Sequence, residues 1–203
     1  MKAHLAAYRV IAIPRRLRTG RHRGQDFRGG FLRFAKLKTD IDLMMNSDRN
    51  PDARFTTMLD LYALPGDFPE RARAFAEPDP YKKVAILEEA MRQSVGSSRL
   101  TPYLQLHEFE ALLLTQPGEL KSEFPERSRA IDRLATSLAG CEAERVNDGA
   151  DTAPSKRIIA QVPEYEGRKV TAGPNLARRI GLPTLRARAP HFDAWLARLE
   201  SLA

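Results

Sequence analysis

Three ionisable side chains interrupt an otherwise apolar run near the middle of the chain. His107, Glu108 and Glu110 lie in the segment LQLHEFEALLL, and Asp60 closes another apolar segment, RFTTML. Carboxylates that converge at one place suit a hard cation such as Mg²⁺, which takes one or two carboxylates together with waters and phosphate oxygens. These residues predict a Mg²⁺ site for metal-assisted phosphoryl transfer. Asp60 and Glu110 would be its ligands, and His107 is a further catalytic candidate.

Each of these residues also has an ordinary structural interpretation. Carboxylates in the first turn of a helix are favoured by the helix dipole. On a helix, Glu108 and Glu110 would face about 200° apart, so they would not share one site. Because Glu110 borders the apolar face of that helix, we expect it to be partly buried with a perturbed pKa, and Glu108 to be solvated. A packed histidine more often donates a hydrogen bond to a carboxylate or the backbone than binds a metal, so both interpretations of His107, which would face Glu110, stay open.

Two basic segments are candidates for contact with phosphate or nucleic acid. Residues 1–40 hold 11 Lys and Arg against 2 acidic residues, a balance of +9 in a chain whose net charge is +7. The candidates in this part are Arg15, Arg16, Arg18, Arg21, Arg23 and Arg28, in a glycine-rich segment whose N–H groups would be accessible to a phosphate. The second group is Ser155, Lys156 and Arg157, at the expected positive end of a helix. The alternatives are a solvated loop paired with acids elsewhere and a well-capped helix with exposed basic residues.

Alternating strands and helices must position these residues. Hydrophobic periodicity predicts strands over residues 8–13, 54–59 and 101–106, a loop over 15–30, and helices over 31–45, 80–95, 118–123, 128–139, 154–161, 174–181 and 190–202, with a further helix from 109. Without an expected hairpin, this order predicts an α/β fold with a mostly parallel sheet flanked by helices. We expect one domain, with a sheet-containing part over 1–116 and a mainly helical part over 117–203. With the 80–95 helix as crossover, Asp60 and a glutamate would project from the same sheet edge, where such folds bind ligands.

Composition narrows the class of protein. The chain has 203 residues and is 42% hydrophobic, enough to bury a core. No apolar run approaches the roughly 20 residues needed to cross a bilayer, so no membrane association is expected. The single cysteine, Cys141, excludes an internal disulfide and suits a reducing cytoplasm.

Four segments together resemble a known bacterial family. They are FTTMLDLYALPGDFP, PYLQLHEFEALLL, NDGADTAPSKRI and RARAPHFDAWLARLE, which occur in the family's order. By them the chain, from about His4 onward, resembles the uncharacterised DUF family numbered four-two-seven-six. The resemblance implies a Toprim-like fold, akin to the nuclease domains of overcoming-lysogenization-defect proteins, and members are often encoded beside ABC- or AAA-type ATPases. It would make Asp60 the strand-end aspartate and Glu110 the glutamate of the family's FE motif.

The chain departs from this family at its start. Members usually open with a strand followed by EGQTE-like residues, whose first glutamate would be the principal acid of a Toprim site. This chain has no such segment, and residues 4–7 resemble the tail of the helix that should follow it. By the resemblance we therefore expect the sheet to lack its first strand and the metal site to lack one ligand.

Two functions follow as expectations. The first is a Mg²⁺-dependent nuclease subunit that acts on nucleic acid with a partner ATPase, in defence against foreign DNA. The second is a non-catalytic interaction module that binds an ATPase or nucleic acid, as a truncated, inactive copy. In the second, the carboxylates only cap helices.

Overall fold

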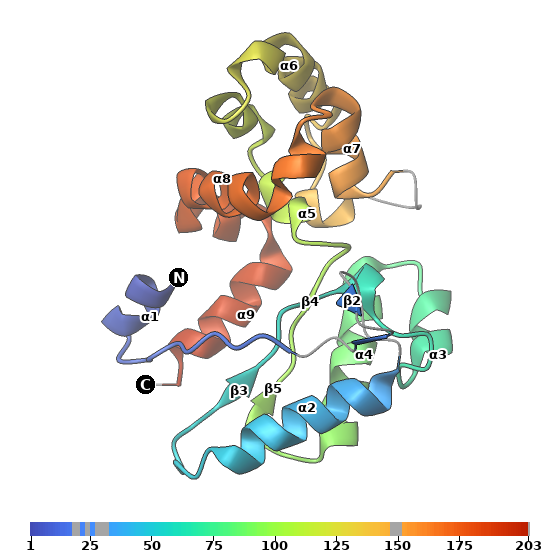
Figure 1. Ribbon diagram of the computed structural model, residues 1–203, viewed down its shortest axis with the longest axis vertical. Coiled ribbons are helices and arrows are strands. Elements are labelled where there is room, and N and C mark those ends of the chain that lie inside the picture. Colours follow the sequence, from blue (N-terminus) through green and yellow to red (C-terminus); the bar gives the residue numbers. More distant parts are fainter. Residues whose placement is uncertain (18–20, 23–24, 27–32, 147–151, 203) are drawn as a thin grey trace. The chain divides into compact units, whose positions relative to one another are not determined.

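The computed structural model of the protein describes residues 1–17, 21–22, 25–26, 33–146 and 152–202 (Figure 1). The chain forms two compact units, which are described separately below. Unit 1 comprises Met1–Ala12 and Leu106–Ala203, and unit 2 comprises Ile13–Gln105. The protein is broadly α/β, with parallel strands in unit 2 and a helical C-terminal part in unit 1, as the sequence pattern predicts.

Unit 2 contains three α-helices among its described residues, α2 (Phe34–Ser47), α3 (Arg71–Ala76) and α4 (Pro80–Val95). The local sequence explains both ends of α4. Asp79 caps its N-terminus by accepting hydrogen bonds from the N–H groups of residues 81 and 82, and Pro80 occupies the first helical position. Gly96 ends the helix in the left-handed conformation, at φ 71°. These bounds match the predicted helix.

Two short parallel ladders run through unit 2. β3 (Phe55–Thr56) pairs with β5 (Leu100–Thr101), and β4 (Leu59–Asp60) pairs with β6 (Leu104–Gln105). Both ladders keep the same register, so they are two parts of one parallel strand pair, with α4 in the crossover (Figure 1). This confirms the predicted parallel neighbours.

A side chain bridges the gap between the two ladders. The hydroxyl of Thr57 accepts a hydrogen bond from the N–H of Tyr103 at 2.9 Å and lies 3.0 Å from the carbonyl oxygen of the same residue. The gap falls at Pro102, which has no N–H to donate. The hydroxyl therefore replaces backbone pairing where the ladder is interrupted.

Two predictions for the N-terminal region are wrong. Residues 8–13 form no strand, and Ile11 and Ile13 are exposed rather than packed. Within the predicted loop over 15–30, β1 (Arg21–His22) and β2 (Gln25–Asp26) pair in antiparallel fashion. The periodicity of residues 8–13 indicated a strand, but strand formation depends on a partner and a core to pack against.

Unit 1 is helical in its described residues. Its α-helices are α1 (Lys2–Ala7), α5 (Glu110–Leu113), α6 (Ser128–Ser137), α7 (Pro154–Gln161), α8 (Tyr165–Arg188) and α9 (Pro190–Glu200), and its 3₁₀ turns are Pro117–Ser122, Pro125–Arg127 and Ala143–Arg145. A kink divides α8 at Gly181, whose φ is 76°. Several apolar side chains of α8 and α9, among them Leu176, Trp195 and Leu196, are buried. None of the described helices is both long and apolar enough to span a bilayer.

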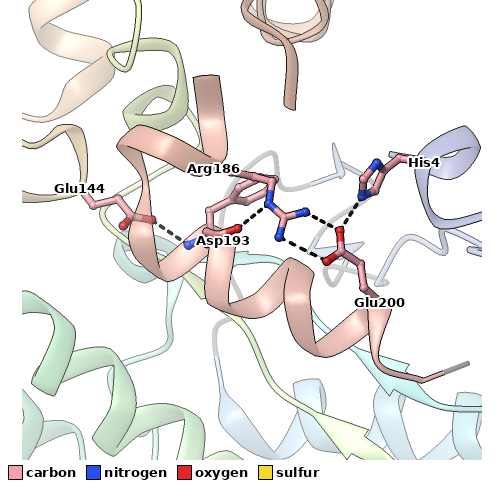
Figure 2. A network of polar contacts seen from close by, with 6 residues as sticks. His4, Glu144, Arg186, Asp193 and Glu200 are labelled. Atoms are coloured by element: carbon pink, nitrogen blue, oxygen red, sulfur yellow. Dashed lines mark hydrogen bonds and ion pairs between the residues drawn. The ribbon is translucent and has the colours of Figure 1, made fainter. Parts of the chain in front are cut away.

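An ionic network holds α9 to its neighbours within unit 1 (Figure 2). Arg186 on α8 donates to Asp193 at 2.5 Å and to both carboxylate oxygens of Glu200, at 2.5 and 3.2 Å. His4 on α1 lies 2.6 Å from the same Glu200 carboxylate. The hydrogen bonds from His4 and Arg186 lower the pKa of Glu200 below its ordinary value. The network therefore favours the ionised carboxylate and joins α1, α8 and α9.

Candidate active site

The corner that follows β6 carries the ionisable residues singled out in the sequence. His107 has a positive φ of 63°, which is uncommon for a residue other than glycine, and Glu110 begins α5 four residues after Leu106. This left-handed backbone conformation of His107 interrupts any regular helix, and α5 begins only at Glu110. Glu110 follows a strand and opens a helix as predicted, whereas Glu108 precedes the helix, so the prediction that both lie on it is wrong for Glu108.

Glu110 is the buried carboxylate of this corner, with only 8% of its surface exposed. The phenol of Tyr165, at the start of α8, donates to its Oε1 at 3.2 Å. Burial raises the pKa of Glu110, and the nearby Glu108 carboxylate raises it further, while Lys169 acts in the opposite direction. This agrees with the expectation that Glu110 is the partly buried, perturbed residue.

Tyr165 itself is fully buried. Burial and the neighbouring Glu110 carboxylate raise the pKa of Tyr165 well above its ordinary value. The phenol therefore keeps its proton at neutral pH and acts as a hydrogen-bond donor. Close packing fixes its position, because a Cβ at Gly173 would lie only 3.3 Å from the phenol oxygen and 3.2 Å from the ring of Phe109.

Glu108 is half-buried and caps a helix other than its own. Its Oε1 accepts a hydrogen bond from the N–H of Ser155 at 2.5 Å, in the first turn of α7. The favourable dipole interaction predicted for Glu108 thus involves α7, 47 residues later in the chain. A carboxylate of the protein itself therefore already occupies the end of α7 where the sequence predicted an anion.

His107 is buried, and its Nε2 lies 3.0 Å from the carbonyl oxygen of Glu144. Of the two acceptors predicted for His107, a carboxylate or a backbone group, this hydrogen bond uses a backbone carbonyl. The side chain of Glu144 is fully buried and accepts from the N–H groups of His191 and Phe192, at 2.8 and 3.0 Å (Figure 2). Glu144 thereby links the corner at His107 to the N-terminus of α9.

Asp60 ends β4 and is half-buried in unit 2. It is paired in register with Gln105, the last residue of β6. Glu110 follows Gln105 by five residues but belongs to unit 1. The strand pairing shows only that Asp60 lies beside Gln105 at the end of a parallel pair.

The basic candidates fall into three groups. Arg15 and Arg16 line a cavity of about 500 Å³ in unit 2, together with Asp40 and Ser47. Lys156 is exposed, and Arg157 donates to the carbonyl oxygen of Thr152 at 2.9 Å, as expected for basic residues on a capped helix. Arg18, Arg23 and Arg28 lie outside the described residues, and for Arg21 only the backbone of β1 is described.

Sequence reasoning missed three residues of this corner, Tyr165, Lys169 and Glu144. All three are distant from residues 107–110 in the chain, and no local pattern marks them. Within the described ranges, no group of three or more His, Cys, Asp or Glu side chains is arranged to hold a metal ion. Glu110 and Glu108 are nevertheless two carboxylates of the type and number that Mg²⁺ uses, since it completes its shell with waters and phosphate oxygens.

Comparison with known proteins places the chain in a family. A search of the curated proteins and a search of the solved structures each find no match. A family model described as a domain of unknown function, DUF4276, matches residues 1–200. This match covers nearly the whole chain and agrees with the resemblance of its four segments. The chain belongs to the DUF4276 family.

Proposed function

We propose that the protein is a Mg²⁺-dependent nuclease in which Glu110 is a metal ligand. The observation that carries the proposal is the environment of Glu110. It is a buried carboxyl group with a raised pKa, next to a second carboxylate and directly after a parallel strand pair. A carboxyl group with a raised pKa that follows such strands is a favoured candidate for a functional site.

A divalent cation would relieve the unfavourable electrostatics of this corner. Burial and the charge of Glu108 both oppose ionisation of Glu110. A cation bound to Glu110 would take the place of the proton whose binding the raised pKa favours, so metal binding would release protons. Asp60, whose strand ends beside Gln105, is the other carboxylate that the sequence predicts for metal binding, and it is tested by its own substitution.

When bound, Mg²⁺ would polarise a phosphate and lower the pKa of a bound water. The protein's own residues position the reacting groups. The Tyr165 phenol stays protonated and holds one oxygen of Glu110 by donating to it. Lys169 supplies positive charge near the same carboxylate. The proposed partners, a nucleic acid and an ATPase acting in defence against foreign DNA, rest on the family resemblance.

Cleavage of labelled DNA and RNA tests the proposal. Purified wild-type protein should cleave in Mg²⁺ or Mn²⁺ and not in EDTA. Glu110→Gln and Asp60→Asn should each reduce the rate by at least about 10- to 100-fold, the loss that is typical even for residues that only support metal ligands. Glu126→Gln, at an exposed position of the same unit, should retain wild-type activity. Equal activity in all four proteins would exclude Glu110 and Asp60 as ligands.

The second candidate function is a non-catalytic interaction module. The contact of Glu108 with the start of α7 favours it, because capping this helix is sufficient to explain the position of the carboxylate without a metal. In that case the wild type would show neither cleavage nor metal-dependent stabilisation. Binding to nucleic acid or to a partner ATPase would then be the same in Glu110→Gln as in the wild type.

A further inference from the structure

A surface of unit 2, distant in sequence from the candidate active site, combines an aromatic ring with two positive charges. Phe75 on α3 keeps 39% of its surface exposed. The guanidinium carbon of Arg71, one helical turn earlier, lies 4.0 Å from the ring centroid. The ammonium group of Lys83, in the first turns of α4, lies 5.3 Å from the same centroid. Two adjacent helices thus bring both cations to one ring.

Neither cation is neutralised by the described part of the chain. No carboxylate of the described residues forms an ion pair with Arg71 or Lys83, and Nε of Arg71 is the one buried side-chain nitrogen or oxygen there without a hydrogen-bond partner. Nearby acids are engaged elsewhere, since Glu70 pairs with Arg73 and Glu77 accepts a backbone N–H. This surface therefore places two cations, neither ion-paired with a described carboxylate, around an exposed ring.

Stabilisation of the fold explains only part of the arrangement of Arg71, Phe75 and Lys83. A cation over an aromatic face stabilises the packing of α3 on α4. One cation is sufficient for that contact, and a buried donor without an acceptor is destabilising. An external anion would supply the missing acceptor after a small rotation of the Arg71 side chain. The cluster thus has the charge and the donor to bind an anionic ligand, with an aromatic surface beside them.

We propose that Arg71, Phe75 and Lys83 form a binding surface for single-stranded nucleic acid. Single strands present unstacked bases next to a chain of phosphates, and proteins bind them by combining aromatic stacking with basic side chains. Here Arg71 and Lys83 contact phosphates, and a base stacks on the exposed part of Phe75 and the flat guanidinium. Duplex bases are paired and stacked on one another, so a duplex gains only the phosphate contacts. The surface extends the proposed nuclease function without resting on it, because binding needs no metal.

The proposal is tested by fluorescence anisotropy in the presence of EDTA. The probe is a labelled oligothymidylate of about 16 nucleotides, a length that covers typical single-strand sites. The absence of metal separates binding from any cleavage. Phe75→Leu keeps an apolar side chain but removes the ring, and should weaken binding by about fivefold or more. Arg71→Ala/Lys83→Ala should weaken binding and reduce the slope of log K against log salt by about 1.4, or about 0.7 for each phosphate that the variant no longer neutralises.

Arg49→Ala is the matched control, since it removes one exposed charge from the same unit at a position outside α3 and α4. It should bind within about twofold of the wild type, because an isolated surface charge contributes little. Circular dichroism confirms that each variant is folded. The proposal would be overturned if Phe75→Leu bound with wild-type affinity, or if Arg49→Ala weakened binding as much as Arg71→Ala/Lys83→Ala does. It would also be overturned if the wild type did not bind the single strand, or if it bound a matched duplex more tightly. RNA in place of DNA establishes which single strand is preferred.

Discussion

Replacing Glu110 with glutamine should make the protein more stable at neutral pH. The pKa of Glu110 is raised from its ordinary value of 4.5, mainly by burial. Above pH 4.5 the unfolded chain loses this proton while the folded chain retains it, so the free energy of unfolding falls as the pH rises toward the folded pKa. Glutamine does not ionise, and its amide oxygen still accepts from the Tyr165 phenol. The variant therefore avoids this decrease in stability.

The size of the effect follows from the pKa difference between the two states. Each unit by which folding raises the pKa is worth about 1.4 kcal/mol of unfolding free energy at pH values above the folded pKa. In a protein of this length, each kcal/mol shifts the melting temperature by about 2–4 °C. The stability difference between Glu110→Gln and the wild type should be small near pH 4.5, grow with pH, and level off once the folded carboxyl ionises.

Urea unfolding from about pH 4.5 to about pH 8 measures this difference. The single tryptophan, Trp195, is buried in α9, so its fluorescence reports the folding of unit 1, which contains Glu110. Glu126→Gln, at an exposed site, should stay within about 0.5 kcal/mol of the wild type at every pH. A wild type that is more stable than Glu110→Gln at neutral pH, or a difference that does not change with pH, would refute the reasoning.

The remaining predictions concern the contacts around this corner and the helix end at Gly96. Glu144→Gln should lower the unfolding free energy by about 1–3 kcal/mol, because the charged acceptor of two N–H groups at the start of α9 is removed; urea unfolding measures this. Gly173→Ala places a methyl group 3.3 Å from the Tyr165 phenol and should destabilise by about 1–3 kcal/mol through overpacking; a neutral effect would contradict that packing. Gly96→Ala should cost about 1 kcal/mol because its φ is 71°, while Gly66→Ala, with open space around it, serves as its control.

Elements with strong local signals are predictable from the sequence. The bounds of α4 and α7 match because Asp79, Pro80 and Gly96 mark the ends of α4 and Pro154 marks the start of α7. The periodicity does not predict α3, since it has only six residues and no side-chain cap. It also does not predict the first half of α8, because Pro174 indicates a helix start, whereas this proline lies inside the helix. A proline within a helix is an exception that tertiary packing allows.

The candidate site is predictable in its local part only. Burial of Glu110 follows from its apolar neighbours at Leu112 and Leu113, which fix the inward face of α5. The contacts that define its chemistry are distant in sequence. The Tyr165 phenol lies 55 residues from Glu110, and the helix that Glu108 caps begins 46 residues after it. Such pairs depend on tertiary packing, which hydrophobic periodicity does not encode.

Calorimetric titration with Mg²⁺ tests the central claim, that Glu110 binds the metal, most directly. The wild type should bind Mg²⁺. Because the pKa of Glu110 is raised, more protons should be released on binding as the pH is lowered toward 4.5, seen as a binding heat that depends on the ionisation enthalpy of the buffer. Glu110→Gln should show no binding, and Glu126→Gln should behave as the wild type. Wild-type Mg²⁺ affinity in Glu110→Gln would contradict the assignment of Glu110 as a metal ligand.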